Sequence, residues 1–158
     1  MRITELLKKE SIKLGVKVAD KNAAIDKLIS LMDAGGRLNS TQGYKEGILA
    51  REALGSTAIG EGIAIPHAKV EAVKEPGLAA MVIKNGVEFE ALDDEPVTLL
   101  FLIAAPNTED NVHLDVLSKL SVMLMDEEFT ESLRNASSVD EFMDIIDRAD
   151  SEKKDIDE

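Results

Sequence analysis

Two histidines are the residues of this chain whose chemistry and position are most suggestive. His67 follows an apolar run and a proline in the segment GEGIAIPHAK, residues 60–69, and His113 opens HLDVLSKLSVML, residues 113–124. An imidazole near neutral pH serves as a base, a metal ligand or a nucleophile. Because proline lacks an N–H and ends ladder pairing, we expect His67 just past a strand terminus, at the edge or end of a sheet. We expect His113 in the first turn of a helix, where free N–H groups suit an anion.

Two other residues, Arg51 and Thr57, precede His67 and could support it. Arg51 shares a helical stripe with Tyr44 and Ile48. It supplies positive charge to a site, or it only interacts with the C-terminal end of its own helix. Thr57 supplies a hydroxyl shortly before the glycines, or it only completes a turn. The two histidines also have simpler interpretations. His67 could be an ordinary loop histidine, and His113 could be a core histidine hydrogen-bonded to backbone.

Several classes of site are poorly supported by the sequence. The chain has no cysteine, which excludes a disulfide, a zinc–thiolate site and a thiol nucleophile. The two histidines lack the local spacing of metal ligands, and neither GxSxG, a Walker A motif nor GxGxxG occurs. We therefore expect no metal and no cofactor. An imidazole nucleophile with anion-stabilising neighbours is the equipment for taking up and passing on a phosphoryl group.

Helical patterns flank a central block of strand patterns. Residues 12–18 alternate like a short strand, Asp20 is placed to cap a helix ending near Ala34, and Ser40 one ending near Gly55. Residues 78–83 read as a strand, Asn85-Gly86 as a hairpin turn, and residues 87–92 as the return strand. The nearly continuous apolar run 97–105 indicates a strand buried on both faces. An amphipathic helix opens at His113 and two shorter helices follow, the last opened by a capping box at residues 138–141.

This order of elements predicts an α/β fold, a layered sandwich with a mixed central β-sheet flanked by helices on both faces. The 158 residues indicate one domain, which we place at residues 1–148, followed by an acidic and flexible tail at 149–158. No apolar run is long enough to span a bilayer, and the N-terminus lacks a signal peptide. We therefore expect a soluble, cytoplasmic protein without direct membrane insertion. The net charge of −13 disfavours nucleic acid and favours a basic partner.

At this point two segments resemble a known family. REALGSTAIGEGIAIPHAK, residues 51–69, is similar to the signature of the enzyme IIA components of the bacterial sugar phosphotransferase system, fructose/mannitol class. HLDVLSKLSVML resembles the second block of that family, and the similarity runs from about Ile3 to Ile146. One departure is Ala68, where many relatives have glycine, so that a methyl group is expected to narrow the approach to the backbone there.

The resemblance implies that the chain is a phosphotransferase with a phosphohistidine intermediate. His67 would accept a phosphoryl group from phospho-HPr, a small phosphocarrier, and pass it to a IIB domain that feeds sugar uptake through a membrane IIC. His113 would stabilise the phosphate, with Arg51 and Thr57 in support. Nitrogen-type relatives share these motifs, so the alternative is a regulatory protein that binds others according to its phosphorylation. A binding module with unreactive histidines is the third possibility. Which sugar is transported does not follow from this domain, because the sugar never touches it.

Overall fold

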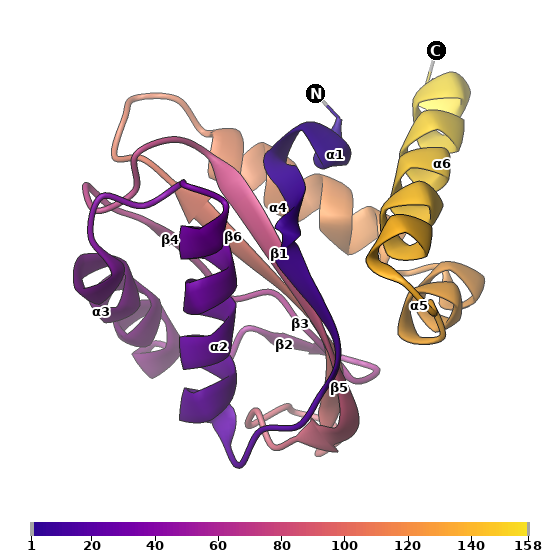
Figure 1. The fold of residues 1–158 in the computed structure, drawn as a ribbon, viewed down its shortest axis with the longest axis horizontal. Helices are drawn as coiled ribbons and strands as arrows, with labels where there is room; N and C mark the ends of the chain where they lie inside the picture. The colour runs from indigo at the N-terminus through magenta and orange to yellow at the C-terminus, as the bar shows by residue number, and fades with distance from the viewer. Residues whose placement is uncertain (1, 158) are drawn as a thin grey trace.

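The computed structural model describes residues 2–157, and of residues 152–157 only the backbone. Its elements in chain order are α1 (Ile3–Leu6), β1 (Leu7–Val16), α2 (Lys21–Ala34), α3 (Thr41–Ala53), β2 (Ala58–Gly60), β3 (Ile63–Ala64), β4 (His67–Lys69), β5 (Gly77–Val87), β6 (Val97–Ala105), α4 (Val112–Met123), α5 (Glu127–Arg134) and α6 (Val139–Asp157). Figure 1 shows α2 and α3 on one side of the strands and α4, α5 and α6 on the other. Within the described residues, no helix combines the length and the apolar character that crossing a membrane requires.

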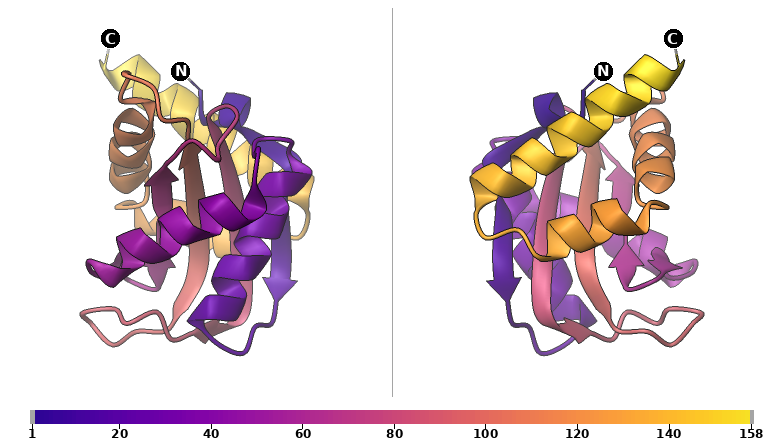
Figure 2. Two further views of the ribbon diagram at one scale, coloured as in Figure 1. Left: turned by 90° about the vertical axis from the view of Figure 1, so that its left-hand side faces the viewer. Right: turned by 90° about the vertical axis from the view of Figure 1, so that its right-hand side faces the viewer.

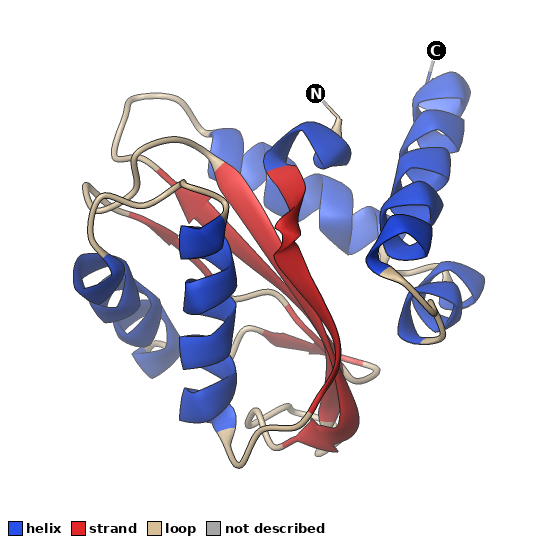
Figure 3. Ribbon diagram, in the orientation of Figure 1, coloured by secondary structure: helices blue, strands red, loops and turns tan. Residues whose placement is uncertain are grey.

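A mixed sheet of six strands forms the middle layer (Figure 3). The strands lie in the order β1-β5-β6-β3-β2, and β4 pairs with β6 as well. β1 runs parallel to β5, while β5 and β6 are antiparallel. Both β3 and β4 run parallel to β6, and β2 is antiparallel to β3. The expected α/β sandwich with a mixed sheet is therefore confirmed.

Strand β6 separates two hydrophobic clusters, one on each face of the sheet. Its residues Leu100 and Leu102 pack with α2 and α3, while Phe101 and Ile103 pack with α4, α5 and α6. Side chains alternate between faces along a strand, so an apolar residue is needed at nearly every position. This explains the continuous apolar run in the sequence, and Figure 2 shows helices on both sides of the strands.

The predicted starts of α2 and α3 are confirmed. Asp20 Oδ1 accepts a hydrogen bond of 2.8 Å from the N–H of Ala23, and Ser40 Oγ accepts one of 3.0 Å from Gly43. Each bond satisfies a backbone donor that has no partner within the first helical turn. These caps fix where α2 and α3 begin, and α3 carries Arg51 toward the site.

The hairpin predicted at Asn85-Gly86 is wrong. A two-residue type I′ turn needs positive φ at both residues, but only Gly86 has one, at 76°. β5 runs on through Val87, which pairs with Val97 of β6 across an irregularity in the register. Residues 88–92, expected in a return strand, lie in the loop between β5 and β6, although Phe89 and Ala91 are buried as the alternation suggested.

The C-terminal helix differs from the expectation in length. α6 has 19 residues and is longer than α4, which has 12. At its start Ser138 Oγ accepts from the N–H of Glu141, but the Glu141 carboxylate accepts from Ser137, so only half of the predicted capping box forms. Asp150, the first acid of the C-terminal run, is buried. The domain boundary at residue 148 and the flexibility of residues 149–158 remain predictions, since residue 158 and the side chains from 152 onward lie outside the described residues.

Candidate active site

His67 lies on a strand that is interrupted immediately before it. Both β3 and β4 follow β6 in parallel, with Ile63 opposite Leu99 and His67 opposite Ile103. Ile65 and Pro66 break this line, because proline has no N–H for the ladder, although the Pro66 carbonyl still accepts from Ile103 N at 2.9 Å. His67 therefore opens the short strand β4 and does not follow a strand end in a loop, which corrects the expectation. Its position at an edge of the sheet is as predicted.

The imidazole of His67 is half-buried and is held by a backbone carbonyl two residues earlier in the chain. Its Nδ1 lies 2.9 Å from the carbonyl oxygen of Ile65. A carbonyl oxygen only accepts hydrogen bonds, so the geometry assigns the proton of the neutral ring to Nδ1. This tautomer leaves the lone pair on Nε2. The result is an imidazole with a defined orientation, whose Nε2 has no hydrogen-bond partner among the described residues.

His113 lies in the first turn of α4, as expected, and α4 packs on the face of β4 to which His67 points. Its Nδ1 is buried and has no hydrogen-bond partner in the described part of the chain. Burial, followed by the charges of Lys69 and His67, lowers the pKa of His113 below its usual 6.5, against smaller opposing effects of Asp110 and Asp115. His67 is among the groups that act on this pKa, and α4, which carries His113, packs against β4, which carries His67. His113 is thus neutral at pH 7.

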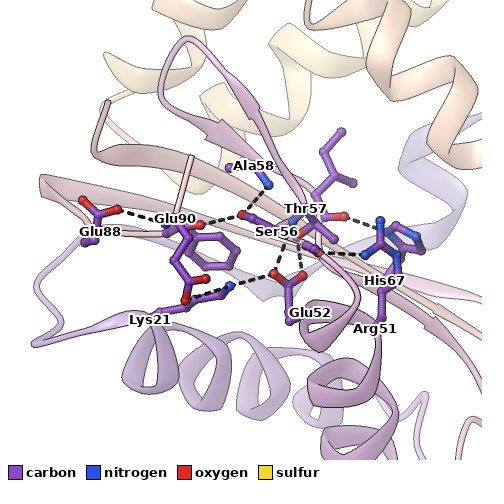
Figure 4. A network of polar contacts seen from close by, with 12 residues as sticks. Lys21, Arg51, Glu52, Ser56, Thr57, Ala58, His67, Glu88 and Glu90 are labelled. Atoms are coloured by element: carbon purple, nitrogen blue, oxygen red, sulfur yellow. Dashed lines mark hydrogen bonds and ion pairs between the residues drawn. The ribbon is translucent and has the colours of Figure 1, made fainter. Parts of the chain in front are cut away.

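Arg51 occupies the last turn of α3 and is half-buried. Its Nη1 donates a hydrogen bond of 2.8 Å to the carbonyl oxygen of Gly55, just beyond the helix. This bond is the local structural role considered from the sequence. A guanidinium has five N–H donors, so others remain for a ligand, and Figure 4 draws this group at the same end of the polar network as the His67 ring.

Thr57 is buried, with 5% of its surface exposed. Its hydroxyl donates to Glu52 Oε2 at 2.5 Å, and its N–H donates to Glu52 Oε1 at 3.2 Å. The hydroxyl is therefore committed to a carboxylate. Its carbonyl accepts a bond of 3.1 Å from the N–H of Ile65, so Thr57 holds the backbone next to His67.

Sequence reasoning missed two residues near the site. Glu52, adjacent to Arg51, is a buried carboxylate that holds Thr57. Lys69 lies two residues after His67 on β4 and shares its face. Its Nζ donates 2.8 Å to the carbonyl oxygen of Asp110, in the loop that leads to His113. Strand alternation would have identified Lys69 had β4 been expected to begin at His67, whereas nothing in the sequence marks Glu52 as buried.

The methyl group of Ala68 does not face His67. It belongs to the cluster on the opposite side of the sheet, against α2 and α3, because successive side chains of a strand alternate between faces. The expected narrowing at this position is thus a contact with α3 and not an obstruction at the imidazole. Across the described residues, no group of three or more histidine, aspartate or glutamate side chains is arranged to hold a metal ion.

Comparison with known proteins relates this geometry to one family. Residues 5–149 match the family model described as phosphoenolpyruvate-dependent sugar phosphotransferase system, EIIA 2. The chain is 48% identical over 150 residues to the PTS system fructose-specific EIIABC component of Bacillus subtilis. That alignment covers 95% of this chain but only 24% of the relative, so the chain spans about a quarter of its length.

Solved structures have the same fold. The nitrogen regulatory protein IIA-Ntr from Neisseria meningitidis superposes with a TM-score of 0.83 at 34% identity, covering 90% of this chain and 97% of that one. Enzyme IIA for mannitol from Escherichia coli, solved in complex with phosphorylated enzyme IIB, superposes with a TM-score of 0.76 at 35% identity, covering 89% and 98%. Relatives with transport names and relatives with regulatory names therefore both resemble this chain.

Proposed function

Since the chain belongs to the EIIA family of the sugar phosphotransferase system, fructose/mannitol class, we propose that it carries a phosphoryl group on His67 between two other proteins. The donor is the phosphohistidine of HPr and the acceptor is a cysteine of a IIB domain, which feeds sugar uptake. The observation that carries the proposal is the 2.9 Å contact between His67 Nδ1 and the Ile65 carbonyl, because it leaves Nε2 free to attack.

The transfer is a balanced displacement at phosphorus. The Nε2 lone pair of His67 attacks, an N–P bond forms, and the bond from phosphorus to the donor's imidazole breaks, with its electron pair returning to that nitrogen. His67 keeps its proton on Nδ1 and donates it to the Ile65 carbonyl oxygen. This hydrogen bond stabilises the positive charge that develops on the ring. Transfer to a IIB thiolate repeats the step with His67 as the leaving group. Because such transition states are loose, positioning and charge stabilisation provide most of the catalysis.

Three side chains provide that stabilisation. An unpaired N–H costs more to bury than an unpaired lone pair, so the neutral His113 carries its proton on Nε2 and donates it to a phosphoryl oxygen. Arg51 supplies charge with the donors that Gly55 leaves unused. Lys69, on the same face of β4 as His67, adds a second positive charge. Thr57 supports the site indirectly through the backbone of Ile65.

The surface near the site suits protein partners. Leu54, just past the helix that carries Arg51, has 85% of its surface exposed, and Leu114, beside His113, has 51%. A partner protein that docks over the site would cover both of these apolar side chains. The net charge of −13 speeds encounter with a basic phosphocarrier. The complex of a relative with phosphorylated IIB supports the acceptor, and membership of a cytoplasmic phosphorelay supports exchange in the cytoplasm, with IIC contacted only indirectly.

The experiment is incubation with enzyme I, HPr and phosphoenolpyruvate, followed by intact mass measurement. The wild type gains one phosphoryl group and His67→Ala gains none. A phosphohistidine formed in the variant would overturn the assignment, and an unlabelled wild type would overturn the proposed function. The label is expected on Nε2, which two-dimensional ¹H–¹⁵N NMR of the phosphorylated ring determines.

A regulatory role is the second candidate, because IIA-Ntr superposes with a higher TM-score than the mannitol enzyme. The 48% identity to a fructose-specific component favours transport. Neighbouring IIB and IIC genes would support transport, whereas a neighbouring sigma factor or dedicated regulatory phosphocarrier would support regulation. Transfer of label from the phosphorylated chain to a purified IIB domain tests the transport role directly.

A further inference from the structure

We infer that Glu52, held in place by Lys21, is a positioning residue for phosphoryl transfer, because it fixes the tautomer and orientation of the His67 imidazole through Thr57 and Ile65. The inference rests on the proposed function and adds a determinant that lies outside the site itself. Glu52 touches neither His67 nor a ligand, and it acts through the backbone between them (Figure 4).

Glu52 is anchored on the side away from His67. Only 9% of its surface is exposed, and its Oε1 lies 3.0 Å from Lys21 Nζ. Lys21 begins α2, has 15% of its side chain exposed, and places its ammonium 4.7 Å from the centre of the Phe89 ring. A buried carboxylate needs a charged partner and hydrogen bonds. Lys21 is that partner, and its position is fixed by α2 and by the ring of Phe89.

Both oxygens of the carboxylate hold Thr57. Oε1 accepts from its N–H at 3.2 Å and Oε2 from its hydroxyl at 2.5 Å. Two bonds to one residue fix its backbone and side chain together, whereas a single bond would allow rotation. Thr57 immediately precedes β2, so the bonds also set where that strand begins.

The remaining links run from Thr57 to the imidazole. The Thr57 carbonyl accepts from Ile65 N at 3.1 Å, and the Ile65 carbonyl faces His67 Nδ1 at 2.9 Å. A single residue, Ile65, thus lies between Thr57 and the imidazole, with its N–H bonded to Thr57 and its carbonyl facing His67. Pro66 has no N–H and cannot donate to a neighbouring strand. The bond from Ile65 N to Thr57 is therefore not reinforced by a backbone bond from the next residue. Loss of the Glu52 bonds would let the Ile65 carbonyl turn away and free the ring to adopt the other tautomer.

An ion pair is an unusual means of holding a turn. A buried pair is often no more stabilising than apolar residues of similar volume, so stability alone does not require an acid at this position. A carboxylate, however, provides a separate acceptor oxygen for each of the two donors of Thr57. Glutamine replaces one of these oxygens by an NH2 donor and removes the charge that pairs with Lys21. It therefore cannot reproduce the two-oxygen arrangement, which makes it the informative substitution.

The test compares Glu52→Gln, Thr57→Val and Thr57→Ser with a matched control. Asp150→Asn is that control, since Asp150 is also a buried carboxylate paired with a lysine, Lys119, and accepting a backbone N–H, that of Ile3. Two quantities are measured on folded protein: kcat/KM for phosphorylation by phospho-HPr, and the ¹⁵N shifts of the His67 ring at a pH of about 8.5, where an ordinary imidazole is neutral. The shifts report which nitrogen carries the proton.

Glu52→Gln and Thr57→Val are expected to lower kcat/KM about 10- to 100-fold, as other orienting partners do, and to populate the tautomer protonated on Nε2. Thr57→Ser keeps the hydroxyl and is expected to retain the wild-type kcat/KM and ring shifts. Asp150→Asn is expected to lower only the melting temperature. Wild-type shifts and rates in folded Glu52→Gln and Thr57→Val overturn the inference. An unlabelled wild type instead overturns the proposed function, and the ring shifts then still decide whether Glu52 positions His67.

Discussion

Tyr44 donates a hydrogen bond of 2.7 Å to the carbonyl oxygen of Ile103, the residue of β6 that pairs with His67. The tyrosine is fully buried, and burial raises the pKa of its phenol well above 10, so the hydroxyl stays a donor. Ile103 in turn donates its N–H to Pro66. Helix α3 is therefore joined to the sheet at the position where His67 begins β4.

Tyr44→Phe is expected to lower the free energy of unfolding by about 1–2 kcal/mol, because a buried carbonyl loses a partner and the ring still fills its site. Urea unfolding measures the change. Tyr44→Leu, which also leaves a cavity, serves as the reference for a larger loss. An unchanged unfolding midpoint in Tyr44→Phe would mean that the bond contributes nothing.

His113→Ala is expected to impair phosphoryl transfer more than His113→Gln, because glutamine keeps an N–H donor of similar reach and alanine removes it. His67 remains the labelled residue in both variants. Transfer rates and melting temperatures are measured on the same two samples. If both variants lost stability while the folded fraction transferred normally, His113 would be only a core histidine.

The lowered pKa of His113 predicts how stability depends on pH. In the unfolded chain the imidazole has its ordinary pKa of about 6.5, and in the folded protein burial and the charges of Lys69 and His67 lower it. Between these two values the unfolded state binds more protons, so falling pH destabilises the folded state. From a pH of about 7.5 to about 5.5, the wild type should lose more free energy of unfolding than His113→Gln. Denaturant titrations at several pH values measure the difference, and a greater loss in the variant would mean a raised pKa.

Arg51→Gln is expected to slow transfer, since removal of a well-aimed donor to a developing charge costs roughly 2.7–4 kcal/mol at most. A smaller effect is expected for an arginine that also bonds Gly55. Arg148→Gln is the matched control, because Arg148 forms an exposed ion pair with Asp144 on α6. If both variants transferred at the same rate, Arg51 would have only its structural role, the hydrogen bond to Gly55 at the end of α3.

Ala68→Gly should lower stability by about 1 kcal/mol through the lost methyl burial and the added backbone freedom, without slowing transfer. The methyl group packs on the α3 side, where a Cβ at Gly47 would lie only 3.3 Å from it. Thermal unfolding and the phosphorylation rate are the two measurements. A faster glycine variant would show that this methyl obstructs the imidazole after all.

Much of the fold follows from local sequence rules. The caps at Asp20 and Ser40 and the apolar strand 97–105 depend on neighbouring residues, and all three are confirmed. The hairpin at Asn85-Gly86 does not form because β5 continues through both residues to Val87. Gly86 also packs closely on Pro96, so that an added Cβ would lie 2.8 Å from the Pro96 Cβ. This packing joins the two ends of the loop between β5 and β6, which the two-residue pattern does not reveal.

The residues of the candidate site show the same difference: some can be recognised from the sequence, and others only from tertiary contacts. The histidines are rare residue types in suggestive places, so the sequence identifies them. Glu52 looks like any acid on a helix, and only the packing of Lys21 against it reveals that it is buried. The sequence shows that Thr57 has a hydroxyl, but the partner of that hydroxyl depends on the turn after α3. Tertiary contacts, more than local pattern, determine which polar side chain becomes an anchor.

The parallel pairing of β1 with β5 has a kinetic consequence. Leu7 lies opposite Leu78, so two helices and three strands lie between these paired strands in the sequence. β5 and β6, by contrast, meet across one loop. Because closing long loops costs entropy before contacts compensate for it, refolding is expected to form the β5–β6 pair early and to add β1 late. Until β1 arrives, the long edge of β5 is open, and a nascent chain is then most vulnerable to pairing with a neighbour.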